Sequence, residues 1–262
     1  EDYGICLILD GKVQSSTVDE FIYHEALVHP VMITHPAPET VLVIGGGEGA
    51  TIREILKHNV VKRVVMVDLD EEVIQVSKKY IPQLSAGAFD DRRLNLIFDD
   101  GRAYLEKTSE KYDVIIIDVT DPLREGPSYL LYTKQFYELV KKALKPDGMM
   151  VTQATSTFYS KKSYTVIYNT LRQVFPIVRA YSAWVPSYNS LWGFVLASLK
   201  YDPLSLSEDD VKIKLSQRGV TNLKFYSPEY HKPLFALPLY IQRALEEEKD
   251  IATDENPTFM PA

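Results

Sequence analysis

The sequence predicts an α/β fold in which a small N-terminal β element precedes a Rossmann-like sheet. Apolar runs of strand length alternate with helical stretches from Thr40 onward, and this alternation is typical of a parallel sheet with crossover helices. A glycine-rich turn, Gly45-Gly-Gly-Glu-Gly49, joins the first of these runs to a helix. Upstream, Asp10-Gly11 separates two short β-prone runs, which is a signal for a hairpin.

The N-terminal element is expected to be a hairpin of residues Tyr3 to Leu9 and Lys12 to Thr17, followed by a helix from Glu20 to His29. Proline restricts its own backbone and lacks a hydrogen-bond donor. Three prolines after this helix therefore predict a linker to the main domain: Pro30, Pro36 and Pro38. Residues 1–38 form the hairpin element and linker in this interpretation.

The main domain is expected over residues 39–200. Apolar runs predict its strands at Val41–Ile44, Val64–Val67, Leu94–Phe98, Val114–Ile117 and Met149–Thr152, with two more near Val178–Trp184 and Trp192–Leu199. Helices are expected at Thr51–Lys57, Glu71–Tyr80, Arg102–Lys107, Thr133–Leu144 and Ser163–Val174. Residues 201–262 predict a C-terminal wrap on the same domain, with helices at Ser207–Arg218 and Leu239–Glu248 and a loop over Thr253–Ala262.

Composition and charge restrict the class of protein and of partner. The 262 residues suffice for one Rossmann-like domain with a smaller addition. A net charge of -7 argues against nucleic acid and suits a cationic small molecule. The single cysteine, Cys6, excludes an intrachain disulfide and a thiolate zinc cluster. No apolar run approaches the roughly 20 residues of a membrane span, and the first residues do not resemble a signal peptide, so we expect a cytoplasmic protein.

Two features predict a nucleotide-like ligand at the first two strands. The glycine-rich turn lets a ligand approach the backbone, and the following helix offers free N–H groups. Asp68 ends the second strand about twenty residues later, where a carboxylate can accept hydrogen bonds from both ribose hydroxyls. Dinucleotide and adenosyl-sulfonium enzymes share both features, so these residues leave an NAD dehydrogenase open.

Further carboxylates follow the third and fourth strands. At Asp99-Asp100-Gly101, a carboxylate can accept from an adenine amino group, or can simply cap the next helix. Asp118-Val-Thr-Asp121-Pro122 places two carboxylates beyond a buried strand, at the edge where α/β sheets bind ligands. The alternative is a turn rich in Asp and Pro. Two neighbouring carboxylates nevertheless require solvent or a cation, and an amine substrate would supply the cation.

Glu48 places negative charge inside the glycine-rich turn. A carboxylate tail, such as that of S-adenosylmethionine, would be repelled there, whereas a decarboxylated tail that ends in an ammonium would be attracted. An acidic residue is also favourable near a helix N-terminus for reasons unrelated to a ligand, so this residue alone leaves both interpretations open.

Taken together, these motifs resemble those of the polyamine aminopropyltransferases, the spermidine and spermine synthase family. The similar segments run in order over residues 9 to 122: Leu9-Asp-Gly-Lys-Val-Gln14, Asp19-Glu-Phe-Ile-Tyr-His-Glu25, His35-Pro-Ala-Pro38, Gly45-Gly-Gly-Glu-Gly49, Arg53-Glu-Ile-Leu-Lys-His58, Asp100-Gly101 and Asp118-Val-Thr-Asp-Pro122. The resemblance implies a methyltransferase-type sheet and aminopropyl transfer from decarboxylated S-adenosylmethionine, a co-substrate, with no permanently bound cofactor and no metal. It also implies a homodimer or homotetramer.

The resemblance further assigns roles by motif position. Asp118 would be the general base, and the acceptor amine would meet Tyr23, Asp121 and Tyr188. The donor would be held by Gln14, His24, Glu48, Asp68, Asp100, Gly101 and Pro127. The remaining histidines, His29, His35, His58 and His231, are expected to be packing, linker or surface residues.

Four departures from the family pattern refine these expectations. Relatives begin with more β structure, including an upstream Gln, so we expect this chain to be truncated at its start. Glu48 stands where relatives usually have Asp, and Thr155 stands where putrescine-using relatives have Glu. The loop Leu123–Pro127 is longer than usual, and Tyr129-Leu-Leu-Tyr-Thr-Lys134 resembles thermospermine synthases and prokaryotic enzymes that act on longer amines.

We therefore expect the acceptor to be spermidine, another triamine or agmatine rather than putrescine. The absent carboxylate at Thr155 and the altered loop motivate this expectation, with Trp184 and Phe158 as candidate aromatic contacts. The alternatives are a spermidine synthase that uses putrescine, an S-adenosylmethionine-dependent methyltransferase, and a polyamine-binding protein without turnover.

Overall fold

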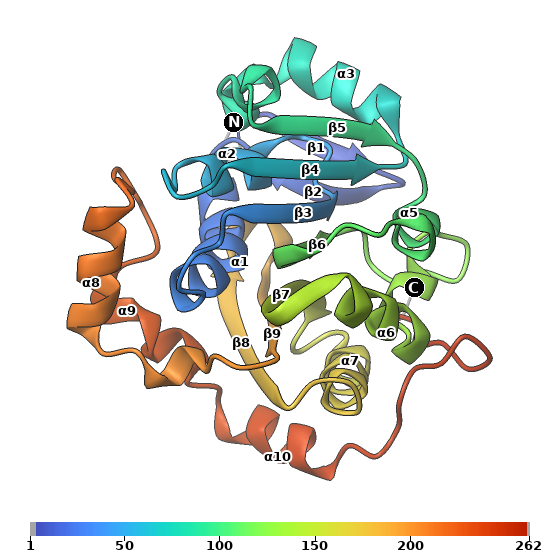
Figure 1. Ribbon diagram of the computed structural model, residues 1–262. Helices are drawn as coiled ribbons and strands as arrows, with labels where there is room; N and C mark the ends of the chain where they lie inside the picture. Colours follow the sequence, from blue (N-terminus) through green and yellow to red (C-terminus); the bar gives the residue numbers. More distant parts are fainter. Residues whose placement is uncertain (1–3, 261–262) are drawn as a thin grey trace.

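The structure of the protein is a computed structural model, and residues 4–260 are described. Residue 3 of the expected hairpin and residues 261–262 of the expected tail lie outside the described residues. The main feature is a seven-stranded sheet in the order β5-β4-β3-β6-β7-β9-β8, accompanied by a separate two-stranded sheet (Figure 1). The strands of the main sheet are β3 (Thr40–Gly45), β4 (Arg63–Asp68), β5 (Leu94–Phe98), β6 (Tyr112–Asp118), β7 (Leu144–Ser156), β8 (Ile177–Val185) and β9 (Ser190–Ser198).

The sheet is parallel from β5 to β7 and antiparallel beyond it. The expected parallel arrangement is confirmed for β5, β4, β3, β6 and β7. β9 pairs antiparallel with both β7 and β8. The short turn at Pro186–Tyr188 joins β8 directly to β9, and a connection of this length cannot provide the crossover that a parallel pair needs. All five parallel strands consequently direct their carboxyl ends to one edge of the sheet.

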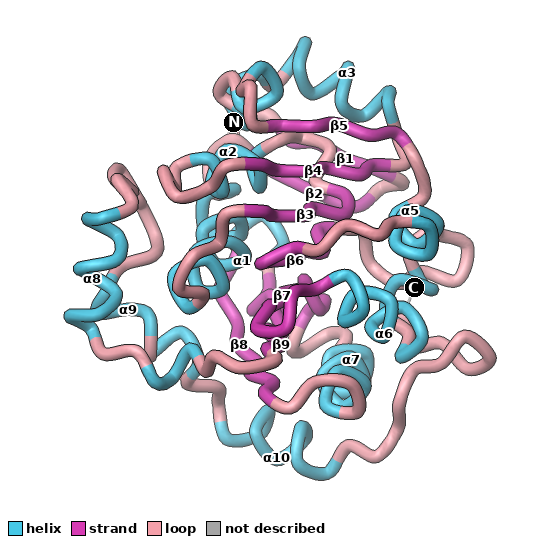
Figure 2. The backbone as a smooth tube through the Cα atoms, viewed as in Figure 1, coloured by secondary structure: helices cyan, strands magenta, loops and turns pink. Residues whose placement is uncertain are grey.

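Helices cover both faces of the sheet (Figure 2). Alternate residues of the strands face opposite sides: Leu42 and Ile44 belong to one apolar cluster, and Val41 and Val43 to the other. The first cluster includes residues of α5 (Gly101–Lys107), α6 (Lys134–Ala143), α7 (Lys161–Arg172) and α10 (Leu239–Glu247). The second includes residues of α1 (Glu20–Thr34), α2 (Ala50–Leu56) and α3 (Glu71–Tyr80).

Shorter elements complete the chain. Two single-turn helices are α4 (Pro82–Ser85) and α9 (Pro228–His231), and α8 spans Glu208–Gln217. Turns of 3-10 helix occur at Ala88–Asp90, Tyr129–Tyr132, Pro186–Tyr188, Pro203–Ser205 and Pro233–Phe235. Most expected helices and strands therefore exist, with ends that differ by a few residues.

The N-terminal hairpin is present as expected. Strands β1 (Cys6–Leu9) and β2 (Lys12–Ser16) pair antiparallel around the turn at Asp10 and Gly11. Both turn residues have positive φ, 49° and 76°, which is the backbone that an Asp-Gly hairpin turn of this length adopts.

The helix α1 does not end before Pro30, contrary to the prediction from sequence, and continues to Thr34. Pro30 lacks the N–H that would bind the carbonyl oxygen of Ala26 one turn earlier. The hydroxyl of Tyr181, on β8, donates to that oxygen at 2.9 Å instead. A residue distant in sequence thus satisfies the group that proline leaves free, so the helix passes through the position where a linker was expected.

The C-terminal residues run around the outside of the main domain. Figure 1 shows the chain passing from α8 past α10 and returning toward α5 and α6. There, Asp254 forms an ion pair with Arg102 at 2.6 Å, and the N–H of Met260 donates to the carbonyl of Pro122 at 3.0 Å. The end of the described chain is consequently attached to the loop that follows β6.

Candidate functional site

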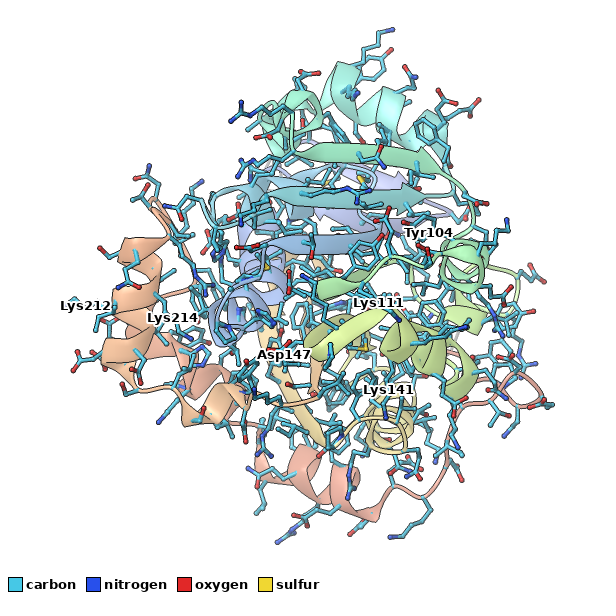
Figure 3. The ribbon with its side chains drawn as sticks, viewed as in Figure 1. Tyr104, Lys111, Lys141, Asp147, Lys212 and Lys214 are labelled. Atoms are coloured by element: carbon cyan, nitrogen blue, oxygen red, sulfur yellow. The ribbon has the colours of Figure 1, made fainter. Side chains whose placement is uncertain are left out.

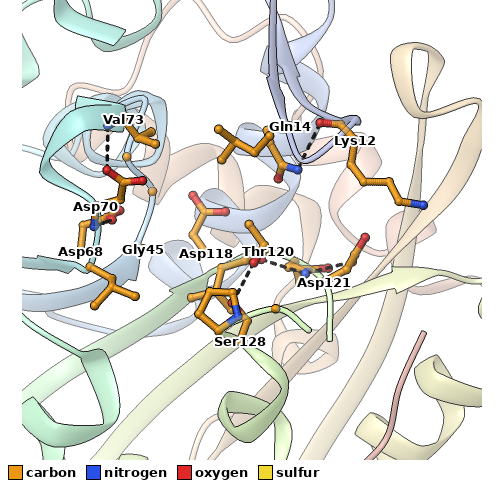
Figure 4. A pocket seen from close by; sticks show the side chains of 18 of the residues that line it. Lys12, Gln14, Gly45, Asp68, Asp70, Val73, Asp118, Thr120, Asp121 and Ser128 are labelled. Carbon is orange, nitrogen blue, oxygen red and sulfur yellow. Dashed lines mark hydrogen bonds between the residues drawn. The ribbon is translucent and has the colours of Figure 1, made fainter. Parts of the chain in front are cut away.

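A cavity of about 450 Å³ lies at the carboxyl ends of the parallel strands. Its wall combines the glycine-rich turn after β3, the ends of β4 and β6, the N-terminal hairpin and the loop after β6. The expected site residues that line it are Gln14, Tyr23, Glu48, Asp68, Asp100, Gly101, Asp118, Asp121, Pro127 and Tyr188. Figure 4 shows Asp118 between Asp68 and Asp121 in this view.

The glycine-rich turn is pressed against the end of β6. Gly45 has a φ of 83°, and a Cβ atom at this position would lie 2.1 Å from the carbonyl oxygen of Asp118. The N–H of Gly46 donates to the same oxygen at 2.9 Å. A side chain at Gly45 would therefore move the backbone that carries Asp118.

Asp118 is the central carboxylate of the cavity. Its Oδ1 accepts a hydrogen bond from the hydroxyl of Tyr23 at 2.7 Å, and its Oδ2 accepts one from Thr51 at 2.5 Å. Burial, followed by the negative charge of Glu48, raises the pKa of Asp118 above its ordinary value. A carboxylate with a raised pKa and a fixed orientation can accept a proton from a bound group.

Asp121 lies on the loop after β6 and is half-buried. Burial raises the pKa of its carboxyl to about 6, although the hydrogen bond from Gln153 acts in the opposite direction. Gln153 Nε2 lies 3.3 Å from Asp121 Oδ1 and donates to the carbonyl oxygen of Val119 at 2.9 Å. Gln153 thereby joins β7 to the loop and lines the cavity, although the sequence analysis assigned it no role.

Two more carboxylates follow neighbouring strands. Asp68 ends β4, and burial raises the pKa of its carboxyl to about 6 despite a hydrogen bond from the N–H of Asp70. Asp100 is the N-cap of α5, where its Oδ1 accepts from the N–H of Ala103 at 2.7 Å. The capping role considered for this Asp pair is confirmed for Asp100, which also lines the cavity.

His24 is the one expected donor-binding residue that does not line the cavity. It is buried behind Glu48, and its Nε2 lies 3.0 Å from Glu48 Oε1. His24 would therefore influence a ligand only indirectly, through its contact with the Glu48 carboxylate.

Some expected aromatic contacts lie elsewhere. Trp184 is 51% exposed and Phe158 is 64% exposed, and neither lines the cavity. Trp192 does line it and packs edge-on against Tyr188, with 4.7 Å between ring centroids. Trp192 and Trp184 both lie in apolar runs that predict strands, and only the pairing of β8 with β9 shows which of the two faces the cavity.

Position 155 also lies outside the lining. Thr155 is fully buried and has a φ of 65°, and its hydroxyl has no hydrogen-bond partner among the described residues. Position 155 therefore supplies no carboxylate to the cavity, and the threonine itself does not line it.

The remaining histidines are packing residues. His29, His35, His58 and His231 are all buried, so the surface alternative is excluded for each of them.

Negative charge dominates the cavity wall. Among the described residues, Lys12 is the one cationic side chain that lines it, against Asp10, Glu48, Asp68, Asp70, Asp100, Asp118 and Asp121. Three lysines outside the cavity, Lys111, Lys141 and Lys214, are labelled in Figure 3. Their ammonium groups donate to backbone carbonyl oxygens of Lys142, Val174 and Ile33, respectively. The cavity is therefore suited to a ligand that carries positive charge.

Residues 4–260 contain no group of three or more His, Cys, Asp or Glu side chains arranged to hold a metal ion. Within the same residues, no helix has the length and apolar character needed to cross a membrane.

The sequence and the fold both match known proteins. The family described as "Spermine/spermidine synthase domain" matches residues 20–207. Polyamine aminopropyltransferase 2 of Hyperthermus butylicus is 51% identical over 258 residues, which are 98% of this chain and 85% of the relative. Polyamine aminopropyltransferase of Sulfurisphaera tokodaii is 46% identical over 260 residues, 99% of this chain and 86% of the relative.

Solved structures agree. A spermidine synthase in complex with the transition state analogue AdoDATO has a TM-score of 0.87 and 37% identity, with 94% of this chain and 83% of that chain covered. Spermidine synthase from Thermotoga maritima has a TM-score of 0.84 and 35% identity, with 94% and 81% covered. The fold class expected from the sequence is confirmed.

The contact between Gly45 and Asp118 yields a test. Gly45→Ala should destabilise the protein by about 2 kcal/mol or more beyond Gly11→Ala, because both glycines have positive φ but only Gly45 faces a clash. No atom lies within 4 Å of a Cβ added at Gly11, so that variant isolates the backbone strain. Denaturant unfolding of both variants measures the difference, and equal losses would show that the close approach to Asp118 is unimportant.

Proposed function

Because the chain belongs to the spermine/spermidine synthase family, we propose that it transfers the aminopropyl group of decarboxylated S-adenosylmethionine to a primary amine of a polyamine and releases 5'-methylthioadenosine. The observation that carries the proposal is the arrangement of carboxylates around Asp118 in a cavity whose described lining contains a single lysine. Both substrates are cations, and Lys12 is the one cationic side chain of the described lining.

The donor would occupy the part of the cavity formed by β3, β4 and the start of α5. Asp68 follows β4, where a ribose would meet its carboxylate, and Asp100 and Gly101 begin α5. Gln14, on the hairpin, and Pro127, on the loop after β6, would enclose the donor from the other elements. Glu48 would then face the ammonium of the decarboxylated tail.

The acceptor would lie on the other side of Asp118, near Asp121. Gln153, Tyr188 and Trp192 line this part of the wall with it. The ionised form of Asp121 would bind an ammonium of the polyamine and so orient the primary amine that reacts.

The reaction would be a direct displacement. A free alkylamine has a pKa of roughly 10, so the reacting nitrogen must lose a proton before it can attack. Asp118 would accept this proton, and the freed lone pair of the nitrogen then forms a bond to the aminopropyl carbon beside sulfur. The bond between that carbon and sulfur breaks, and its electron pair stays on the sulfur of the leaving methylthioadenosine. Tyr23 and Thr51 hold the Asp118 carboxylate through this step.

A methyltransferase with the same fold is less compatible with the charges. The carboxylate tail of S-adenosylmethionine would approach Glu48, and the one lysine that lines the described part of the cavity, Lys12, lies on the N-terminal hairpin. A polyamine-binding protein without turnover would not need a carboxylate in the position of Asp118, and turnover separates these alternatives directly.

The acceptor is proposed to be longer than putrescine, such as spermidine, another triamine or agmatine. A short diamine needs an acidic group at each end. Asp121 would supply one of them, but the position where putrescine-using relatives have a second carboxylate is occupied here by Thr155, which is buried. The lining instead includes Asp10, an exposed residue at the turn of the hairpin. A longer amine could reach such a peripheral carboxylate, whereas putrescine would lose a charge-assisted hydrogen bond worth about 1.5–3 kcal/mol.

The other expectations stay predictions. They are a homodimer or homotetramer formed through N-terminal elements, a cytoplasmic location, and the division into residues 1–38, 39–200 and 201–262.

Asp118→Asn tests the proposed function. With decarboxylated S-adenosylmethionine and spermidine, the wild-type chain should release methylthioadenosine, and the variant should lose about 10²–10⁴-fold in kcat because an amide cannot accept the proton. The matched variant Asp121→Asn should mainly raise the KM for the amine. Thermal unfolding checks that both variants fold. Absence of methylthioadenosine from wild type contradicts the function, and near-normal turnover by Asp118→Asn contradicts the assignment of the base.

A comparison of amines tests the acceptor. Under one set of conditions, kcat/KM should be higher for spermidine, norspermidine or agmatine than for putrescine, because the longer amine finds a second carboxylate. Asp10→Asn should reduce the advantage of the preferred long amine and leave putrescine unaffected. A clear preference of wild type for putrescine would refute this proposal while leaving aminopropyl transfer intact.

A further inference from the structure

A row of buried and half-buried charged side chains lies behind the cavity and connects α1 with α2. His24, on α1, faces Glu48 through Nε2 at 3.0 Å and Glu20 Oε2 through Nδ1 at 2.8 Å. Arg53, on α2, donates from Nη1 and Nη2 to the two oxygens of Glu20 at 3.0 and 2.8 Å. Only Glu48 of this row lines the cavity itself.

These contacts determine the protonation of His24. A neutral imidazole has one N–H and one lone pair, so one ring nitrogen would direct its lone pair at a carboxylate. Nδ1 also lies 2.8 Å from the backbone carbonyl oxygen of Glu20, so both of its neighbours are acceptors. Nε2 faces a carboxylate as well, and the geometry therefore requires a proton on each nitrogen.

The charges agree with the geometry. Burial lowers the pKa of His24, but the hydrogen bonds to Glu20 and Glu48 outweigh it and raise the pKa to about 10. Burial likewise raises the pKa of Glu20, but His24 and Arg53 together lower it to about 2. Throughout the neutral range, Glu20 is thus an anion held between two cations.

Resting on the proposed function, we infer that Glu20 and Arg53 are positioning residues that hold His24 as an imidazolium, whose Nε2–H fixes the Glu48 carboxylate for the donor ammonium. If His24 lost its proton, Nδ1 would keep its N–H for the carbonyl of Glu20, and the bare Nε2 would face Glu48. Glu48 would be repelled from its place, and the donor would lose its partner. Glu20 would then act on the donor without touching it.

The remaining groups around His24 do not replace Glu20. Tyr23, beside it on α1, presents its ring edge-on at 5.0 Å between centroids. Asp118, at the end of β6, interacts with His24 through charge but is hydrogen-bonded to Tyr23 and Thr51. Arg53 offers His24 no acceptor; it donates to both oxygens of Glu20 and so fixes the carboxylate that lies between the two cations.

The direct test is the protonation of His24, read by NMR of histidine labelled with ¹³C and ¹⁵N, with His24→Gln to assign the signal. In wild type the ring should stay an imidazolium from pH 6 to pH 9. In Glu20→Gln it should titrate within that range, because one of two carboxylate partners is gone. Glu25→Gln is the matched control: Glu25 is a buried carboxylate on the same helix that accepts from the N–H groups of residues 224–226.

Donor affinity supplies the functional measurement. Between pH 7 and pH 9, the Kd of Glu20→Gln for decarboxylated S-adenosylmethionine should rise about tenfold more than that of wild type or Glu25→Gln, in parallel with the loss of the His24 proton. A neutral His24 ring in wild type at pH 7.5, or the same pH profile in all three proteins, would overturn the inference. If wild type did not bind the donor, the proposed function would fail, whereas the NMR titration would still decide the state of His24.

Discussion

The desolvation of clustered carboxylates is the constraint on which the cavity depends, and repulsion from Glu48 adds to it at Asp68 and Asp118. The parallel strands bring Glu48, Asp68, Asp118 and Asp121 to one edge of the sheet, and the only lysine of the described lining is Lys12. Burial raises the pKa of Asp68 and Asp121 to about 6 and raises that of Asp118 as well. The unliganded cavity therefore carries a cost that cationic ligands relieve on binding.

Neighbouring groups stabilise these carboxylates in two ways: neutral hydroxyl groups bind Asp118, and a cation binds Glu48. Hydroxyl groups of Tyr23 and Thr51 hold Asp118 without neutralising it, which leaves the carboxylate able to accept a proton. Glu48 instead has a cationic partner, because the His24 imidazolium lies directly behind it. In our account this difference separates a base from a binding group: hydrogen bonds orient the first, and an ion pair fixes the second.

The sequence was most informative where function depends on local order along the chain. Each carboxylate of the cavity follows a strand, so the strand pattern alone placed Asp68, Asp100, Asp118 and Asp121 at one edge. The continuation of α1 through Pro30 could not be foreseen, because it depends on a hydroxyl from β8, 155 residues away in sequence. Pairings between distant segments do not leave a periodic signal.

The same limit applies to the wall of the cavity. Gln153 and Trp192 reach it because β7 and β9 pair antiparallel, a pairing that alternation of apolar residues cannot predict. The link between Glu20 and Arg53 joins two helices whose packing also had to be known. Conversely, Trp184 could not be excluded from the site until β8 was known to be the edge strand that carries it on an exposed position.

Proton release on donor binding measures the central constraint most directly. Decarboxylated S-adenosylmethionine carries charges that do not change between pH 6 and pH 8, whereas the carboxyl of Asp68, on the donor side, has a pKa of about 6 and is partly protonated at the lower pH. Titration calorimetry at pH 6 in buffers of different ionisation enthalpy should therefore detect release of a substantial fraction of a proton, and release should approach zero at pH 8. Binding at pH 6 without proton release, or with uptake, would contradict the account.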